Sequence, residues 1–338
     1  MAVRRRGWTG LIVGLVILLV LLWLGYWYAA RSAAEAGLAR IAASNSIACA
    51  GPRIAGFPLV IEVRCDRLTY GDGDDRISAA VGGIAATAPL YWPGTVDAKI
   101  DAPLAVNAPA MGVALSAAWS LGTASASAWF GGLTGAGASF VSLKADNNGV
   151  LTGVPFRSLA AAAARAAIAP AGGGAYTISA DARQLQLTRN GGSALPDLDG
   201  EARVTLLDVG DTLGTDPAET ILAWARNRPT ARIERFRMAG VGAIVASEGS
   251  LSLSADGRLN GSVLLRWNNI AALADLIEAI LPGTRERAET PLQGLNAVSV
   301  AAETEDGPMR QTTLTFTEGM IWLGIFPLPI DPIPPIRF

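Results

Sequence analysis

The 338-residue chain contains no histidine, only two cysteines and only two lysines. Histidine is the commonest general base and metal ligand at neutral pH, so its absence excludes Ser-His-Asp, Cys-His and histidine-ligated zinc sites. Lys99 and Lys144 are the only side-chain amines, and the chain has neither a phosphate-binding Gly-x-x-x-x-Gly-Lys-Ser/Thr motif nor a Gly-x-Ser-x-Gly elbow. We therefore predict no cofactor and no metal site.

Carboxylates alone can run glycoside hydrolysis, because a pair of them suffices. The candidates stand in segments rich in turn-forming Pro and Gly, which account for them without catalysis: Asp197, Asp199, Glu303, Glu305 and Asp306. The sequence therefore predicts that the protein is not an enzyme, and a cleft holding two carboxylates at catalytic separation would reverse that prediction.

Positive charge is scarce after the first six residues. Arg4, Arg5 and Arg6 belong to the 27 basic residues, so 24 basic and 29 acidic residues follow them and the remainder carries a net charge of −5. Neutralising phosphates requires a basic surface, so we do not expect a nucleic-acid partner.

Arginines concentrate in one later segment. Two interpretations stay open: the side chains solvate a strand face and a helix C-terminus, or they contact the phosphates of phospholipid or lipopolysaccharide. The residues are Arg226, Arg228, Arg232, Arg235 and Arg237.

The one long hydrophobic run is Leu11 to Tyr28, eighteen residues without a charge. As a helix it would be roughly 27 Å long, close to the hydrocarbon thickness of a bilayer. Its end carries Trp23, Tyr26, Trp27 and Tyr28, which is typical of an aromatic belt at a membrane interface. We predict an uncleaved membrane anchor; the alternative is a cleaved signal peptide, whose apolar region is usually shorter and lacks such a belt.

The charges flanking this run predict its orientation. Three arginines precede it, whereas Arg31, Glu35 and Arg40 follow it, so the positive-inside rule places the N-terminus in the cytoplasm. The expected location is the inner (plasma) membrane, with the bulk of the chain in the periplasm.

The two cysteines, Cys49 and Cys65, flank a turn with 15 residues between them. An exported domain meets an oxidising compartment, so a disulfide is the natural interpretation. By loop entropy it would stabilise the fold by about 3 kcal/mol. The alternative is two buried free thiols.

Hydrophobic patterning after the anchor predicts an α+β protein, with a mostly antiparallel, curved β-sheet and a few packed helices. Alternation such as that of Leu59, Ile61, Val63 and Cys65 indicates strands with one buried face. Helices are expected over 157–169, 216–227 and 269–281, with a last one from Thr290. The Pro/Gly segment 169–174 is the best linker, which predicts residues 1–46 as tip, anchor and stalk and two β-rich halves, 47–169 and 175–338.

One predicted hairpin, turning at Asp256-Gly257, presents its apolar residues on a single side. That side is either a sealed core or an apolar surface that contacts lipid. The proposed lipid-facing residues are Leu251, Leu253, Val263 and Leu265.

The short anchor, an Ala-rich stalk, the segment Arg53-Ile54-Ala55-Gly56-Phe57-Pro58 and the closing Gly319-Met320-Ile321-Trp322-Leu323-Gly324 together resemble the bacterial family called domain of unknown function 2125. The resemblance covers nearly the whole chain and implies the architecture above and a place in the bacterial envelope. More loosely, the layout resembles AsmA-like envelope proteins, which carry a membrane anchor and a curved sheet with an apolar face.

Two functions follow from this architecture. The first is binding or passage of a lipid-like molecule along the apolar sheet face in envelope maintenance. The second is a scaffold or adaptor of an envelope complex, in which helices close that face. The membrane is the expected partner in both, with lipid or other envelope proteins as further partners.

Overall fold

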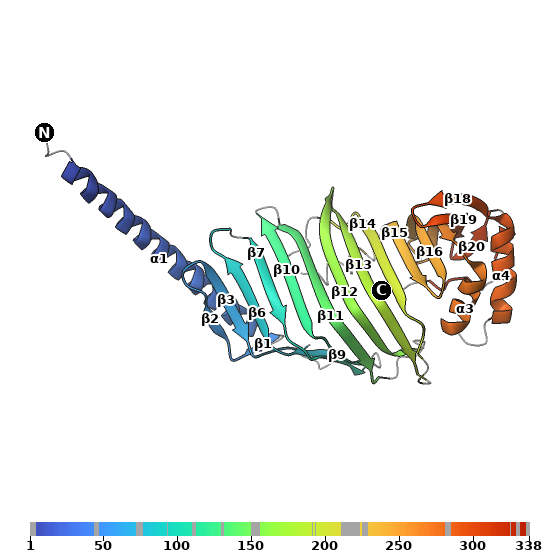
Figure 1. Cartoon of the computed structure of the whole chain (residues 1–338), viewed down its shortest axis with the longest axis horizontal. Helices are drawn as coiled ribbons and strands as arrows, with labels where there is room; N and C mark the ends of the chain where they lie inside the picture. The colour runs from blue at the N-terminus through green and yellow to red at the C-terminus, as the bar shows by residue number, and fades with distance from the viewer. Residues whose placement is uncertain are drawn as a thin grey trace.

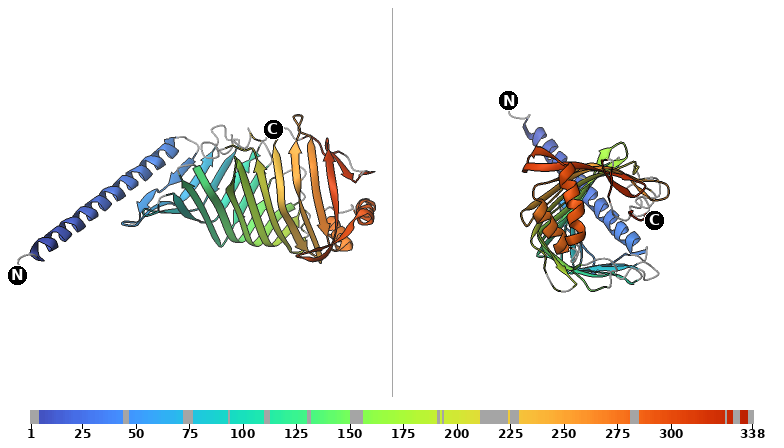
Figure 2. Two further views of the ribbon diagram at one scale, coloured as in Figure 1. Left: turned by 90° about the horizontal axis from the view of Figure 1, so that it is seen from above. Right: turned by 90° about the vertical axis from the view of Figure 1, so that its right-hand side faces the viewer.

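The computed structural model describes residues 5–43, 47–71, 77–92, 94–109, 113–129, 132–149, 156–190, 192, 194–210, 224, 229–280, 285–324, 326–328 and 332–335. Within these residues, an N-terminal helix leads into one antiparallel sheet of 21 strands, and two helices pack at the far end of the sheet (Figure 1). Figure 2 shows that this sheet is curved rather than flat. The predicted fold class is therefore confirmed.

Helix α1 (Arg5–Ala43) projects away from the body and contains the whole apolar run (Figure 1). Its segment Ile12–Arg40 is long and apolar enough to cross a membrane, and none of its most apolar stretch is buried in the protein. The helix continues past the aromatic belt because the Ala-rich stalk lacks helix breakers. The C-terminal half of α1, from Trp23 onward, contacts the sheet.

The middle of the sheet is a simple meander in which each strand pairs with the next along the chain. The strands are β10 (Leu121–Trp129), β11 (Gly132–Asn147), β12 (Phe156–Gly172), β13 (Ala175–Arg189), β14 (Leu198–Leu207), β15 (Thr230–Gly240), β16 (Ala243–Leu253) and β17 (Leu259–Trp267).

The prediction of a helix over 157–169 is wrong, because this segment is most of β12. Alanine favours helix intrinsically, but β12 pairs along its length with both β11 and β13, and tertiary pairing overrides that weak preference. The expected linker is a hairpin turn in which Gly172, Gly173 and Gly174 all adopt positive φ. The strands before and after this turn, β12 and β13, pair with each other, so the sheet is continuous across it. The predicted helix over 216–227 lies outside the described residues except at Trp224.

Towards α1 the sheet divides into two branches that both join β11. One branch runs β2 (Arg53–Ala55), β3 (Val60–Cys65), β6 (Ile84–Pro89), β7 (Thr95–Ile100) and β10. The other runs β1 (Ile47–Ala50), β4 (Arg67–Gly71), β5 (Ser78–Val81), β8 (Leu104–Ala108) and β9 (Val113–Ala118).

The predicted disulfide between Cys49 and Cys65 is confirmed, with a Cα–Cα distance of 5.4 Å. Cys49 lies in β1 and Cys65 at the end of β3, so the bond joins the two branches near α1. Each branch is thus fixed at both ends, by β11 and by the disulfide.

The C-terminal end closes around a small hydrophobic core. Its elements are α3 (Ile270–Ile280), α4 (Arg285–Val298), β18 (Val300–Thr304), β19 (Gly307–Thr317), β20 (Met320–Leu323) and β21 (Phe326–Pro327). The predicted cap of α3 is present: the amide of Ala272 donates to Asn269 Oδ1 at 3.1 Å. Helix α4 begins at Arg285, five residues before the predicted start at Thr290.

Candidate functional site

The strand register aligns alanines from seven neighbouring strands in one row across the sheet. Residues paired across antiparallel strands point to the same face, so these side chains form a continuous band of small apolar groups. In order from β6 to β14 they are Ala86, Ala98, Ala124, Ala138, Ala166, Ala180 and Ala202.

A second row beside it on the same face carries larger apolar side chains. We call the face formed by the two rows the apolar face. From β7 to β20 the row contains Val96, Ala126, Ala136, Ile168, Ile178, Val204, Ile233, Gly249, Val263, Leu314 and Leu323.

The opposite face is polar and carries charges of both signs. One paired row there contains Arg64, Ala85, Lys99, Thr123, Ser139, Arg165, Asp181, Glu201 and Arg237. We call this the polar face. A hollow of about 710 Å³ lies on it, but charged and hydroxyl side chains line this hollow, and water satisfies such groups without a ligand.

On the apolar face lies a groove of about 510 Å³, between β7 and β13. Val96 at one end is 41% exposed and Ile178 at the other is 38% exposed, although both are large apolar residues. The seven strands of the alanine row, spaced about 4.8 Å apart, span roughly 29 Å. That length exceeds the roughly 15 Å that one leaflet of a bilayer's hydrocarbon core occupies.

Protein covers both ends of the apolar face. At the C-terminal end Trp267 is 1% exposed and packs with Leu295 of α4 and Leu323 of β20. At the other end a cavity of about 550 Å³ separates α1 from the branches and is lined by Leu38 of the helix and by Ile54 and Cys65 of the sheet. The exposed groove therefore lies between two covered regions.

The four residues predicted to face lipid all lie on the apolar face, but at its C-terminal end. Val263 is 8% exposed, and Leu265 packs against the cluster around Trp267. Leu251 and Leu253 are half-buried. The exposed groove lies several strands away, on residues that the sequence did not single out. The alanine-rich sequence of β12 was the only indication of the groove, and it was interpreted as a helix over 157–169 instead.

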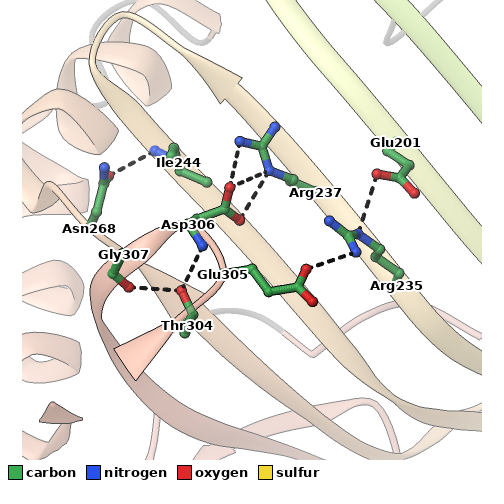
Figure 3. Close-up of polar contacts among 9 residues, drawn as sticks. All are labelled: Glu201, Arg235, Arg237, Ile244, Asn268, Thr304, Glu305, Asp306 and Gly307. Carbon is green, nitrogen blue, oxygen red and sulfur yellow. Dashed lines mark hydrogen bonds and ion pairs between the residues drawn. The ribbon is translucent and has the colours of Figure 1, made fainter. Parts of the chain in front are cut away.

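The predicted arginine cluster is only partly described. Arg226 and Arg228 lie outside the described residues. Arg232 is exposed on β15. Arg235 forms ion pairs with Glu201 at 3.3 Å and Glu305 at 3.4 Å (Figure 3).

Arg237 makes the tightest of these contacts. Its Nε donates to both carboxylate oxygens of Asp306, at 2.9 and 3.1 Å, and a terminal nitrogen donates to Oδ1 at 2.7 Å (Figure 3). The hydrogen bond from Arg237 lowers the pKa of Asp306 below its ordinary value, and the same bond raises the pKa of Arg237. Two of the five arginines, Arg235 and Arg237, thus pair with carboxylates of the protein itself, which agrees with the interpretation of these arginines as part of a solvated strand face.

The candidate catalytic carboxylates form two groups, Asp197 and Asp199 at the start of β14 and the other three at the β18–β19 turn, where they line one hollow. Asp306 and Glu305 bind arginines, Asp197 accepts a hydrogen bond from Gln186 at 2.6 Å, and Asp199 accepts one from the amide of Gln184 at 2.9 Å. Glu303 lies on β18. Among the described residues, no three His, Cys, Asp or Glu side chains are arranged to hold a metal ion.

Neither the curated proteins nor the solved structures contain a match to this chain. The looser resemblance to AsmA-like proteins therefore finds no support in these comparisons. A family model described as an uncharacterized protein conserved in bacteria (DUF2125) matches residues 23–334, which include the C-terminal half of α1 and all the strands of the sheet. The chain belongs to this family.

Proposed function

We propose that the protein is anchored in the inner membrane by α1 and holds a lipid-like molecule, with its acyl chain along the apolar face, in the periplasm. The observation that carries this proposal is the aligned row of seven alanines, bordered by exposed Val96 and Ile178. An exposed contiguous apolar patch is unusual on a soluble surface and typically marks a binding site.

The side chains fit an acyl chain better than a protein side chain. Alanines leave a shallow, smooth floor without pockets for individual residues, and the groove volume lies within the range of small-molecule sites. The nearest source of acyl chains is the bilayer itself, because the sheet begins where α1 ends. The disulfide, typical of exported proteins, supports the proposed periplasmic location.

The proposal includes no catalysis and no cofactor. The second candidate is the scaffold or adaptor, which is favoured at the C-terminal end, where α3 and α4 close the apolar face over Trp267. In that case the groove would bind a protein segment and no lipid.

Adjacent residues of β12 provide the test and its control. Ala166 points to the apolar face and Ala167 to the polar face, both are exposed, and Asp at either position adds the same charge. The full-length protein would be purified in detergent, exchanged into a second detergent and examined by native mass spectrometry for bound phospholipid.

We expect phospholipid on the wild type and on Ala167→Asp, and its loss from Ala166→Asp, because a carboxylate in the groove keeps its hydration and interrupts the apolar path. A wild type that carries no lipid would favour the scaffold. Equal lipid on both variants would refute the groove as the binding site.

A further inference from the structure

Two turns of the sheet lie directly against the aromatic belt of α1. The indole Nε1 of Trp23 donates to the carbonyl of Pro58 at 2.9 Å, and the hydroxyl of Tyr26 donates to the carbonyl of Leu90 at 3.2 Å. Trp27 packs edge-on against Phe57, with ring centroids 5.2 Å apart. These contacts hold the two turns of the sheet beside the last two helical turns of the apolar run in α1.

The same two turns expose large apolar side chains. Tyr91 is 67% exposed and Trp92 is 64% exposed, and Phe57 and Leu59 are also more than half exposed. None of the segment Gly56–Leu59 or the segment Leu90–Trp92 is charged. By contrast, charged residues follow the opposite ends of the same strands: Asp66 and Arg67 come after β3, and Asp101 comes after β7.

We propose that these two turns, Gly56–Leu59 and Leu90–Trp92, insert into the interfacial layer of the bilayer that α1 spans. We call these two segments the membrane-facing turns; their exposed side chains are Phe57, Leu59, Tyr91 and Trp92. Trp and Tyr favour the membrane interface because their rings are apolar while their N–H or O–H groups bind water and headgroups.

The depth follows from the helix. Trp23 lies five residues before Tyr28, which is about 7.5 Å deeper along the helix axis if Tyr28 marks the outer edge of the belt. The turn that Trp23 holds through Pro58 is therefore at the depth of the belt rather than above it. The first charged residue after the aromatic belt is Arg31, one helical turn beyond Tyr28, at the level of the lipid headgroups. Its guanidinium carbon lies 5.7 Å from the ring centroid of Trp27.

The membrane-facing turns also lead to the groove. Leu90–Trp92 connects β6 to β7, and Val96 of β7 begins the second row of the apolar face. Turns seated in the bilayer surface would hold this end of the apolar face where acyl chains are present, so a lipid could reach it without crossing water. This inference rests on the proposed function only in taking α1 as a membrane anchor.

The test uses the full-length protein in phosphatidylcholine vesicles whose acyl chains carry bromine, which quenches tryptophan emission on contact. The contribution of Trp92 is the difference in emission between the wild type and Trp92→Phe. The control is Trp322→Phe, because Trp322 lies on β20 at the end of the sheet remote from α1.

We expect bromine to remove most of the emission assigned to Trp92 and none of that assigned to Trp322. If the emission of Trp92 survives while that of the remaining tryptophans, which include Trp23, falls, the turns lie outside the bilayer and the inference is wrong.

Lipid held in the groove could also quench Trp92, so the pair of measurements is repeated in Ala166→Asp, the variant expected to lose bound lipid. Quenching that persists there assigns the contact to the bilayer, whereas quenching that disappears overturns the inference. A wild type without bound lipid but with quenched Trp92 would refute the proposed groove and leave the membrane-facing turns standing.

Discussion

An aspartate should destabilise the protein far more at the closed part of the apolar face than at the exposed part. Val263 and Ala166 lie on the same face, but Val263 is 8% exposed and Ala166 is exposed. Removing the buried valine loses about 2 kcal/mol of hydrophobic stabilisation. Keeping the new carboxyl group neutral at pH 7, about three units above its ordinary pKa, costs about 4 kcal/mol more.

The total for Val263→Asp is about 6 kcal/mol, comparable with the whole stability of many domains. Ala166→Asp should cost no more than about 1 kcal/mol, because its side chain stays hydrated and only strand preference changes. Thermal melting of the full-length protein in detergent should show a midpoint lower by about 10 °C or more for Val263→Asp, or no folded protein, and by less than about 4 °C for Ala166→Asp.

Acidity provides a second check on the same variant. A buried aspartate has a raised pKa, so the penalty for Val263→Asp should shrink by about 1.4 kcal/mol for each unit that the pH falls from 7 towards that of an ordinary carboxyl group. Equal melting midpoints for the two variants at pH 7 would refute the division of the face into a closed and an exposed part. A penalty that does not change with pH would show that charge burial is not its cause.

Three further predictions concern the disulfide, the ion pair between Arg237 and Asp306, and the topology. Cys49→Ser, Cys65→Ser and the double variant should each lose about 3 kcal/mol of unfolding free energy, because each removes the same cross-link; clearly additive losses in denaturant melts would contradict this. Asp306→Asn should cost about 1 to 2 kcal/mol at pH 7. The difference in melting midpoint between this variant and the wild type should shrink once the pH falls below about 4 and vanish below the lowered pKa of Asp306, because the carboxylate stabilises the fold only while it is charged. A difference that persists at that pH would show that the charge on Asp306 is not its cause. A reporter that is active only outside the cytoplasm should be active when fused after Phe338, and cytoplasmic activity would overturn the predicted orientation.

The sequence predicted those features in which neighbouring residues contrast strongly. The uncharged run of α1 needs no tertiary information, and strand β3 alternates apolar Ile61, Val63 and Cys65 with polar Glu62 and Arg64. Helix α3 combined an amide cap with apolar residues at helical spacing. In each case the local pattern and the tertiary environment favour the same structure.

The groove could not be predicted because its strands lack that contrast. Along β12 alanine occupies both faces, so Ala166 and Ala167 are indistinguishable in sequence although they point to opposite sides. Between Ala160 and Ala167 only Arg165, on the polar face, is not an alanine. The arginine partners were also beyond reach, since Asp306 lies 69 residues from Arg237 and only the folded β18–β19 turn brings them together.

The meander from β10 to β17 makes the length of the groove adjustable. Within it, strands β12 to β16 pair only with their neighbours along the chain, so stability there is close to a sum of adjacent pairings, as in repeat proteins. Gaining or losing a whole hairpin would change the groove by two strand spacings, about 10 Å, while α1 and the C-terminal core keep their local partners. If the groove holds an acyl chain as proposed, duplication of a hairpin would lengthen the site for a longer ligand without redesign of either end.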